Sequence, residues 1–176
     1  LVSSSAASDV YKRQEQSHYL KNVMRCKIGE KILVFDNYTG EYVAELVNIH
    51  KRFIDIEILE KTKSRCIPGD VWLIFCPLKK SRTDFLLEKS TELGVRKFLP
   101  TLSDKTQTKT ISLNRCRKNI VEAVEQCGGT FIPEISPISS LSKVIEQQPE
   151  DRILIFCDET LESRNINESL LSKRPQ

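Results

Sequence analysis

Residues 71–102 have the sequence VWLIFCPLKKSRTDFLLEKSTELGVRKFLPTL, and this stretch determines the expected fold class. Its first seven residues, VWLIFCP, form a continuous apolar run that is typical of a strand in a sheet covered on both faces. Ser81 and Asp84 have the spacing of a capping box, which predicts a helix that ends at Gly94. Residues 95–100 (VRKFLP) predict a second strand, so the stretch indicates an α/β unit with parallel strands. The apolar side chains expected on the helix are Phe85, Leu86 and Leu93.

The same alternation of strands and helices continues after this stretch. Asn114 is placed to cap a longer helix, which Gly128 and Gly129 terminate. Residues 130–136 (TFIPEIS) contain a proline, so we expect a peripheral strand there. A short helix over 140–147 and a fourth strand over 152–158 (RILIFCD) complete an α/β domain with a mainly parallel sheet. The buried stripe of the longer helix is expected to contain Cys116, Ile120, Val124 and Cys127.

The upstream segment has the alternating pattern of antiparallel strands. Residues 31–47 (KILVFDNYTGEYVAELV) alternate apolar and polar side chains on either side of an NYTG turn, which predicts a β-hairpin. Residues 52–60 (RFIDIEILE) predict a third strand with its isoleucines on one face, and Pro68-Gly69 favours a closing turn. We therefore expect a small antiparallel β-sheet or β-barrel over residues 15–68 and the α/β domain over residues 69–176.

The first 14 residues are expected to be foreign to the rest of the chain. Residues 4–14 (SSAASDVYKRQ) can be back-translated codon by codon into a transposase adaptor used in DNA-sequencing libraries. We therefore expect residues 1–14 to be a non-native leader without a folded element. The whole chain has 176 residues, is 39% apolar and carries a net charge of +3. This near neutrality excludes polybasic proteins that bind nucleic acid through bulk charge alone.

Six cysteines are spread along the chain without a CxxC pair, and only two histidines accompany them. Structural zinc sites take their ligands in closely spaced pairs, so no metal site is expected. Cysteines within apolar runs behave as small buried hydrophobic residues, which favours a reducing, cytoplasmic environment. No apolar stretch approaches the roughly 20 residues of a membrane-spanning helix.

Common nucleotide-binding and hydrolytic motifs are missing from the sequence. GxGxxG, GxxxxGK[ST], HExxH and GxSxG do not occur, so dinucleotide-binding, P-loop, zincin and hydrolase interpretations lose their usual support. A flavodoxin-like nucleotide binder is a weaker alternative, because the first turn of the α/β domain has no glycine-rich loop.

Lys79, Lys80 and Arg82 place three positive charges at the expected carboxyl end of the first parallel strand. An anion such as an RNA phosphate can dock against such a loop. A solvated loop that leads into a helix explains the same residues. Lys89 and Glu92 lie three residues apart on the following helix, where an exposed ion pair explains them. Spacing alone leaves these alternatives open.

Several phrases of the sequence together resemble one protein family. Residues 89–95 (KSTELGV), residues 122–127 (EAVEQC), and His18 followed by residues 23–25 (VMR) have the order and spacing of the RsmE family. Members of this family are 16S ribosomal RNA (uracil-N3)-methyltransferases. The resemblance implies an N-terminal PUA-like β-barrel and a C-terminal SPOUT α/β domain, which agrees with the change of pattern near Asp70.

The resemblance also implies a reaction, in which S-adenosyl-L-methionine donates a methyl group to N3 of a specific uridine in the 16S rRNA of the small ribosomal subunit. Uracil N3 is protonated and normally paired, so the base must be exposed and its proton removed. Family members commonly form homodimers. Pocket candidates near the carboxyl edge of the sheet are Lys89, Glu92, Glu125 and Gln126, with structural roles as the open alternative. RNA-binding candidates are His18, Arg25, Lys79, Lys80 and Arg82.

The sequence departs from the family pattern in several places. Gly129 stands where the family usually has an arginine, and Cys116 stands where it has an aromatic residue. The GPEGG signature and the trefoil knot that bind S-adenosyl-L-methionine are expected beyond Gln176, and the leader takes the place of the first barrel strand. We therefore expect this fragment to be inactive and to show no cofactor binding by calorimetry. The alternative from another class is an RNA-binding module without catalytic activity.

Overall fold

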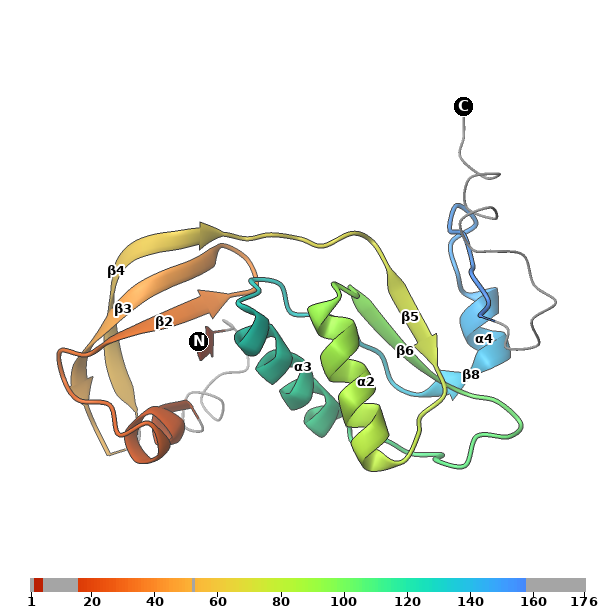
Figure 1. Ribbon diagram of the computed structural model, residues 1–176, viewed down its shortest axis with the longest axis horizontal. Coiled ribbons are helices and arrows are strands. Elements are labelled where there is room, and N and C mark those ends of the chain that lie inside the picture. Colours follow the sequence, from red (N-terminus) through yellow and green to blue (C-terminus); the bar gives the residue numbers. More distant parts are fainter. Residues whose placement is uncertain (1, 5–15, 52, 158–176) are drawn as a thin grey trace. The chain divides into compact units, whose positions relative to one another are not determined.

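The computed structural model describes residues 2–4, 16–51 and 53–157, and these contain two β-sheets (Figure 1). Four strands form the first sheet in the order β1-β2-β3-β4. The second sheet has the order β5-β6-β7, and β8 pairs with β6 beyond the end of β7. The predicted sequence of an antiparallel unit followed by a parallel α/β unit is confirmed.

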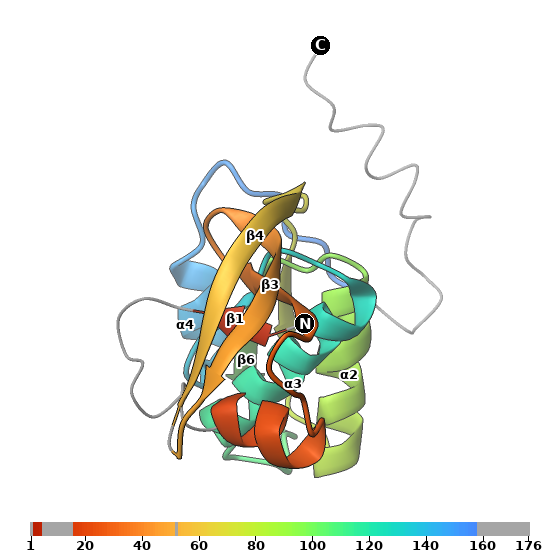
Figure 2. The ribbon, with the colours of Figure 1, turned by 90° about the vertical axis from the view of Figure 1, so that its left-hand side faces the viewer.

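The antiparallel strands of the first sheet are β2 (Lys31–Asp36), β3 (Gly40–Ile49) and β4 (Ile54–Ser64) (Figure 2). The predicted hairpin is formed by β2 and β3, with the turn between Asp36 and Gly40. A short π-helix, η1 (Tyr19–Val23), precedes β2. The fully or nearly buried apolar side chains of the sheet are Val34, Phe35, Ala44 and Leu46.

Strand β4 continues four residues beyond the predicted third strand. The charged residues in this extension pair with β3, where the Glu41 side chain is almost completely buried. The Glu41 carboxylate accepts hydrogen bonds from Thr62 Oγ1 at 2.8 Å and Lys63 Nζ at 3.3 Å. A buried carboxylate needs hydrogen-bond donors. The polar residues at the end of β4 supply them to Glu41, and this interaction stabilises the extension of the strand.

The expectation of a leader without structure is wrong for its residues 2–4. Strand β1 (Val2–Ser4) pairs in parallel with Val34–Asp36 of β2. Without β1, strand β2 would be an edge strand. The unpaired N–H and C=O groups of an edge strand can form hydrogen bonds with any extended segment that lies beside it. The remaining leader residues lie outside the described part of the chain.

Asp36 closes the β2–β3 turn. Its carboxylate accepts hydrogen bonds from the Tyr38 N–H at 2.7 Å and from the Thr39 hydroxyl at 2.6 Å. Partial burial alone would raise the pKa of Asp36, but these hydrogen bonds, together with those from the Thr39 and Gly40 N–H groups, lower it below the ordinary value. The ionised form of Asp36 therefore stabilises the turn.

We expect Asp36→Ala to lower the free energy of unfolding by about 1–2 kcal/mol at pH 7. Because the pKa is lowered in the folded state, the stabilisation is complete above the unfolded pKa of about 3.9 and is lost as the pH falls through the folded pKa. Urea unfolding at pH 7 and near pH 3 should therefore show a smaller cost at the lower pH. Asp104→Ala, in an exposed loop, is the charge-matched control. A cost of Asp36→Ala that does not depend on pH would contradict this role.

The second sheet consists of parallel strands joined by helices. It is formed by β5 (Trp72–Phe75), β6 (Lys97–Leu102), β7 (Glu134–Ile135) and β8 (Ser139–Ser140). The helices are α2 (Lys80–Glu92), α3 (Leu113–Cys127) and α4 (Leu141–Glu146). Strand β7 lies at an edge, as its proline-containing sequence predicted.

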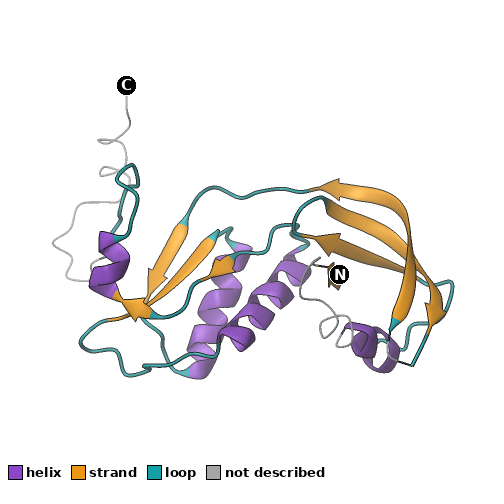
Figure 3. Ribbon diagram, turned by 180° about the vertical axis from the view of Figure 1, so that it is seen from behind, coloured by secondary structure: helices purple, strands orange, loops and turns teal. Residues whose placement is uncertain are grey.

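Helices α2 and α3 cover the same face of the second sheet (Figure 3). The core between them contains Phe75 and Phe98 from neighbouring strands, Leu87 from α2, and Cys116 and Ile120 from α3. The rings of Phe75 and Phe98 meet edge to face with centroids 6.4 Å apart. Cys116 is fully buried and forms part of this core.

The helix boundaries correct three predictions. The N-cap of α2 is Lys79 without a side-chain hydrogen bond, so Ser81 and Asp84 form no capping box. Asp84 instead pairs with Arg115 of α3, with Oδ1 3.2 Å from Nε. Ser112, rather than Asn114, caps α3. Cys127, the last residue of α3, was expected in the buried stripe but is exposed. Phe85 on α2 and Leu93, its C-cap, are exposed as well, and the buried side chains of α2 are Thr83, Leu87 and Thr91.

The predicted fourth strand is also wrong for its described residues, 152–157. They form no strand, and Ile153, Leu154 and Phe156 are 54%, 53% and 81% exposed. An apolar run indicates a preference for burial, but a strand also needs a neighbour with which its backbone can pair. Within the described ranges, no helix is long and apolar enough to cross a membrane.

Candidate functional site

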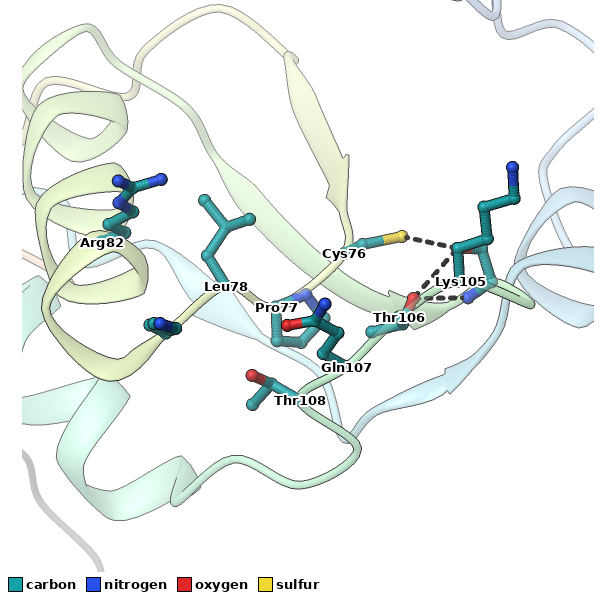
Figure 4. Close-up of a pocket in the computed structure, with 10 residues that line it drawn as sticks. Cys76, Pro77, Leu78, Arg82, Lys105, Thr106, Gln107 and Thr108 are labelled. Carbon is teal, nitrogen blue, oxygen red and sulfur yellow. Dashed lines mark hydrogen bonds between the residues drawn. The ribbon is translucent and has the colours of Figure 1, made fainter.

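A pocket of about 350 Å³ lies where β5 and β6 end (Figure 4). Open parallel sheets bind their ligands at the carboxyl ends of their strands. Residues 76–79 and Arg82 contribute one side of the pocket, and residues 103–108 contribute the other. The residues that line it are Cys76, Pro77, Leu78, Lys79, Arg82, Ser103, Lys105, Thr106, Gln107 and Thr108.

Thr83 holds the loop between β5 and α2 in place. Its hydroxyl accepts a hydrogen bond from the Leu78 N–H and donates one to the Leu78 carbonyl oxygen, both at 3.0 Å. The Thr83 side chain is 1% exposed, so water does not compete for these bonds. The backbone that carries Leu78 and Lys79 to the pocket is therefore constrained.

The loop after β6 is held by a separate hydrogen-bond network. The Ser103 N–H donates to Thr106 Oγ1 at 2.9 Å, and the Thr106 N–H donates to the Ser103 carbonyl oxygen at 3.0 Å. The Cys76 thiol reaches Ser103 Oγ at 3.6 Å, which connects this loop to the end of β5.

The same network changes the acidity of Cys76. Burial acts to raise the pKa of the thiol, but hydrogen bonds with Thr106, Ser103 and Thr101 outweigh burial and lower the pKa from its ordinary value. A lowered pKa increases the fraction of thiolate. The geometry assigns Cys76 a positioning role between the two loops.

The pocket has a strong excess of positive charge. Lys79, Arg82 and Lys105 line it, and no acidic side chain is among its described lining residues. Asp104 is next to Lys105 in the sequence but does not line the pocket. Cationic side chains from two loops therefore belong to a pocket that is also lined by polar hydroxyl and amide groups, which favours an anionic ligand.

Two of the three residues of the predicted basic loop line the pocket. Lys79 and Arg82 line the pocket, whereas Lys80, the first residue of α2, is exposed and does not. Lys105 and Gln107 were missed by the sequence analysis. The signal for them is their position directly after the second parallel strand, because the carboxyl ends of parallel strands meet at one edge of the sheet.

The four pocket candidates on the helices were placed at the wrong edge of the sheet. Lys89 and Glu92 lie at the end of α2, and Glu125 and Gln126 lie at the end of α3. A helix that connects parallel strands starts at their carboxyl edge and returns to their amino edge. The ends of both helices therefore lie away from the pocket, and none of the four residues lines it.

Their interactions agree with structural roles. Lys89 Nζ lies 2.8 Å from Glu92 Oε1 and 2.9 Å from Glu88 Oε1. These carboxylates raise the pKa of Lys89, so it remains a cation. Burial raises the pKa of Glu125, and Glu122 acts in the same direction. Gln126 is exposed.

His18 and Arg25 belong to the segment around η1, before the antiparallel strands. His18 is the N-cap of η1 and is exposed. Arg25 is also exposed and has a φ of 54°, the left-handed conformation that is uncommon for a residue other than glycine. Neither residue lines the pocket.

Two family models match the chain. A model described as an RNA methyltransferase domain matches residues 65–175, and one described as an RNA methyltransferase PUA domain matches residues 13–59. The ribosomal RNA small subunit methyltransferase E of Buchnera aphidicola from Acyrthosiphon pisum is 29% identical over 150 residues, which cover 81% of this chain and 59% of the relative. The Rickettsia conorii protein of the same name is 22% identical over 148 residues, which cover 84% of this chain and 60% of the relative.

Solved structures show the same similarity. Ribosomal RNA small subunit methyltransferase E from Neisseria gonorrhoeae, bound to S-adenosyl methionine, matches with a TM-score of 0.70 and 26% identity over 78% of this chain and 59% of that protein. A probable rRNA-methyltransferase from Porphyromonas gingivalis has a TM-score of 0.74 at 17% identity, over 89% of this chain and 67% of that protein, and supports the fold alone. The chain spans about 60% of the length of the curated relatives named above.

Proposed function

Because the chain belongs to the RsmE family of 16S rRNA methyltransferases, with a PUA domain followed by a SPOUT-like methyltransferase domain, we propose that it is part of an enzyme that methylates N3 of a uridine in 16S rRNA. The observation that supports a role in RNA binding is the basic pocket at the carboxyl edge of the second sheet. The ligand that we propose for this pocket is the sugar-phosphate backbone and base of the rRNA.

Within this proposal, Lys79 and Arg82 bind phosphate oxygens from the α2 side of the pocket. Cationic side chains near the base also stabilise the negative charge that develops on the uracil oxygens as N3 loses its proton. His18 and Arg25 are proposed as further RNA contacts from the N-terminal domain. Lys80, Lys89, Glu92, Glu125 and Gln126 are left out because none of them lines the pocket.

The proposed methyl donor is S-adenosyl-L-methionine, which is bound in the N. gonorrhoeae structure. The described pocket does not fit it. The cofactor carries a sulfonium and an ammonium cation as well as a carboxylate, and the lining of the pocket offers no carboxylate to pair with the two cations. We therefore propose RNA, and not the methyl donor, as the ligand of this pocket. A homodimer in the bacterial cytoplasm is the proposed assembly of the whole protein.

A methylation assay tests this function. The complete reading frame that contains this chain is expressed and incubated with small ribosomal subunits that lack the modification and with labelled S-adenosyl-L-methionine. We expect 3-methyluridine among the rRNA nucleosides by mass spectrometry, and RNA binding without turnover from the 176-residue chain alone. If the complete protein bound rRNA but transferred no methyl group, the alternative of a non-catalytic RNA-binding module would replace the proposal.

A further inference from the structure

We infer that the pocket at the ends of β5 and β6 binds one internal nucleotide of single-stranded RNA, with a separate phosphate at each end. This inference rests on the proposed function, since it takes RNA as the ligand, and it adds the size and the polarity of the bound unit. It assigns Lys105 as the contact for one phosphate and the pair Lys79 and Arg82 as the contact for the other.

The positions of the cations support two phosphate positions and not one. Figure 4 shows Arg82 and Lys105 at opposite ends of the pocket. Lys79 precedes Arg82 by three residues at the start of α2, and the Arg82 N–H donates to the Lys79 carbonyl oxygen at 2.9 Å, so these two residues share one end. Cations at two separate ends match the two phosphates that flank a nucleotide, which are separated by its sugar.

The middle of the pocket has the chemistry of a base-binding site. Gln107 lies beside Pro77 between the two cationic ends, and Thr108 lies next to it (Figure 4). A side-chain amide can both donate and accept hydrogen bonds at a base edge, and apolar groups such as Pro77 and Leu78 can contact a base face. The volume of about 350 Å³ is that of a small-ligand pocket.

A single strand fits this arrangement better than a duplex. In double-stranded RNA the base edges are paired and the deep major groove is not accessible to side chains. A base can enter the pocket only after it has been turned out of a stack or in a loop that is already unpaired. The Cys76–Ser103 and Thr83–Leu78 hydrogen bonds hold both loops before the ligand arrives, which reduces the ordering cost of binding.

The test is a titration of the ¹⁵N-labelled 176-residue chain, followed by amide chemical shifts. The ligands are uridine 3′,5′-bisphosphate, uridine 5′-monophosphate, uridine 3′-monophosphate, uridine and inorganic phosphate. We expect the bisphosphate to shift the signals of residues 76–79 and 103–108 and to bind about tenfold more tightly than either monophosphate. Uridine and inorganic phosphate should bind more weakly than the monophosphates.

Substitutions at the two ends separate the two phosphate positions. Lys105→Ala should reduce the affinity for the bisphosphate about tenfold and should weaken only one of the two monophosphates. Arg82→Ala should weaken the other. The controls are Lys109→Ala and Lys80→Ala, which remove the same charge from exposed positions that do not line the pocket. They should leave all affinities within about twofold.

Three outcomes would overturn the inference. Both substitutions could weaken both monophosphates equally, which would indicate a single anion position. Inorganic phosphate could bind as tightly as the bisphosphate, which would indicate a site for simple anions. The shifts could occur only outside residues 76–79 and 103–108. Each of these outcomes is independent of the methylation assay, because a complete enzyme that methylates uridine could place its RNA elsewhere.

Discussion

The substitution Phe98→Ala should lower the free energy of unfolding by about 3–5 kcal/mol, the cost of removing a large side chain from a packed core. Phe98 is 0% exposed and lies on the central strand of the second sheet, between Phe75 on one side and the helices on the other. Since the surrounding backbone is held by two strands and two helices, the cavity can collapse only in part. Urea unfolding followed by the fluorescence of Trp72, which pairs with Lys97 beside Phe98, measures the loss.

Phe85→Ala is the matched control, because it removes the same side chain from α2 at a position that is 61% exposed. We expect a change of about 0.5 kcal/mol or less from this surface position. Equal losses for the two variants would show that the core does not lie between the second sheet and its helices.

The order of strands and helices was predictable because local patterns specify it. The apolar run at 71–77, the NYTG turn and the glycines after each helix carry their signals in neighbouring residues. Gly94 and Gly128 have φ values of 85° and 65°, in the left-handed region that favours glycine at these helix ends.

The predictions that failed depend on partners distant in sequence. The end of β4 is stabilised by Glu41, about twenty residues upstream, so its charged residues alone did not indicate a strand. Asp84 looked like a capping residue but pairs with Arg115 on another helix. Residues 152–157 have the composition of a buried strand without a pairing neighbour among the described residues.

The candidate site was predictable in part. The sequence identified Lys79 and Arg82 because they directly follow a recognisable strand. It missed Lys105 because its loop has no unusual composition, and the significance of this residue appears only once β5 and β6 are paired. Glu92 and Glu125 were expected at the carboxyl edge of the sheet because they belong to sequence motifs shared with the family, and a motif does not say at which edge of the sheet it lies. Both residues are at the C-terminal ends of their helices, and these ends lie at the amino edge.

The joint substitution of Lys79 and Arg82 by alanine should weaken rRNA binding by the complete protein and make it less dependent on salt. Each phosphate contact to a single strand contributes a slope of about 0.7 to the dependence of log K on log salt concentration, and each contact to a duplex about 0.9. Because Lys79 and Arg82 share one phosphate, their removal should flatten the slope by about 0.7–0.9. The affinity at low salt should fall about a hundredfold, since each charged hydrogen bond contributes on the order of 1.5 kcal/mol. Fluorescence anisotropy of labelled rRNA over roughly 50 to 200 mM salt measures both quantities.

Lys80→Ala separates placement from charge. Lys80 is adjacent to Lys79 and is exposed at the start of α2, but it does not line the pocket. If the pocket binds the phosphates, Lys80→Ala leaves the slope nearly unchanged, while Arg82→Ala alone flattens it by part of the about 0.7–0.9 expected for the joint substitution. Stability should change little in all of these variants, because exposed charges contribute about 1 kcal/mol or less, and circular dichroism checks the fold. Equal slopes for Lys80→Ala and Arg82→Ala would mean that the loop acts through its total charge. Unchanged slopes in every variant would remove the loop from the RNA-binding surface and leave Arg25 and the antiparallel sheet as the proposed RNA contacts.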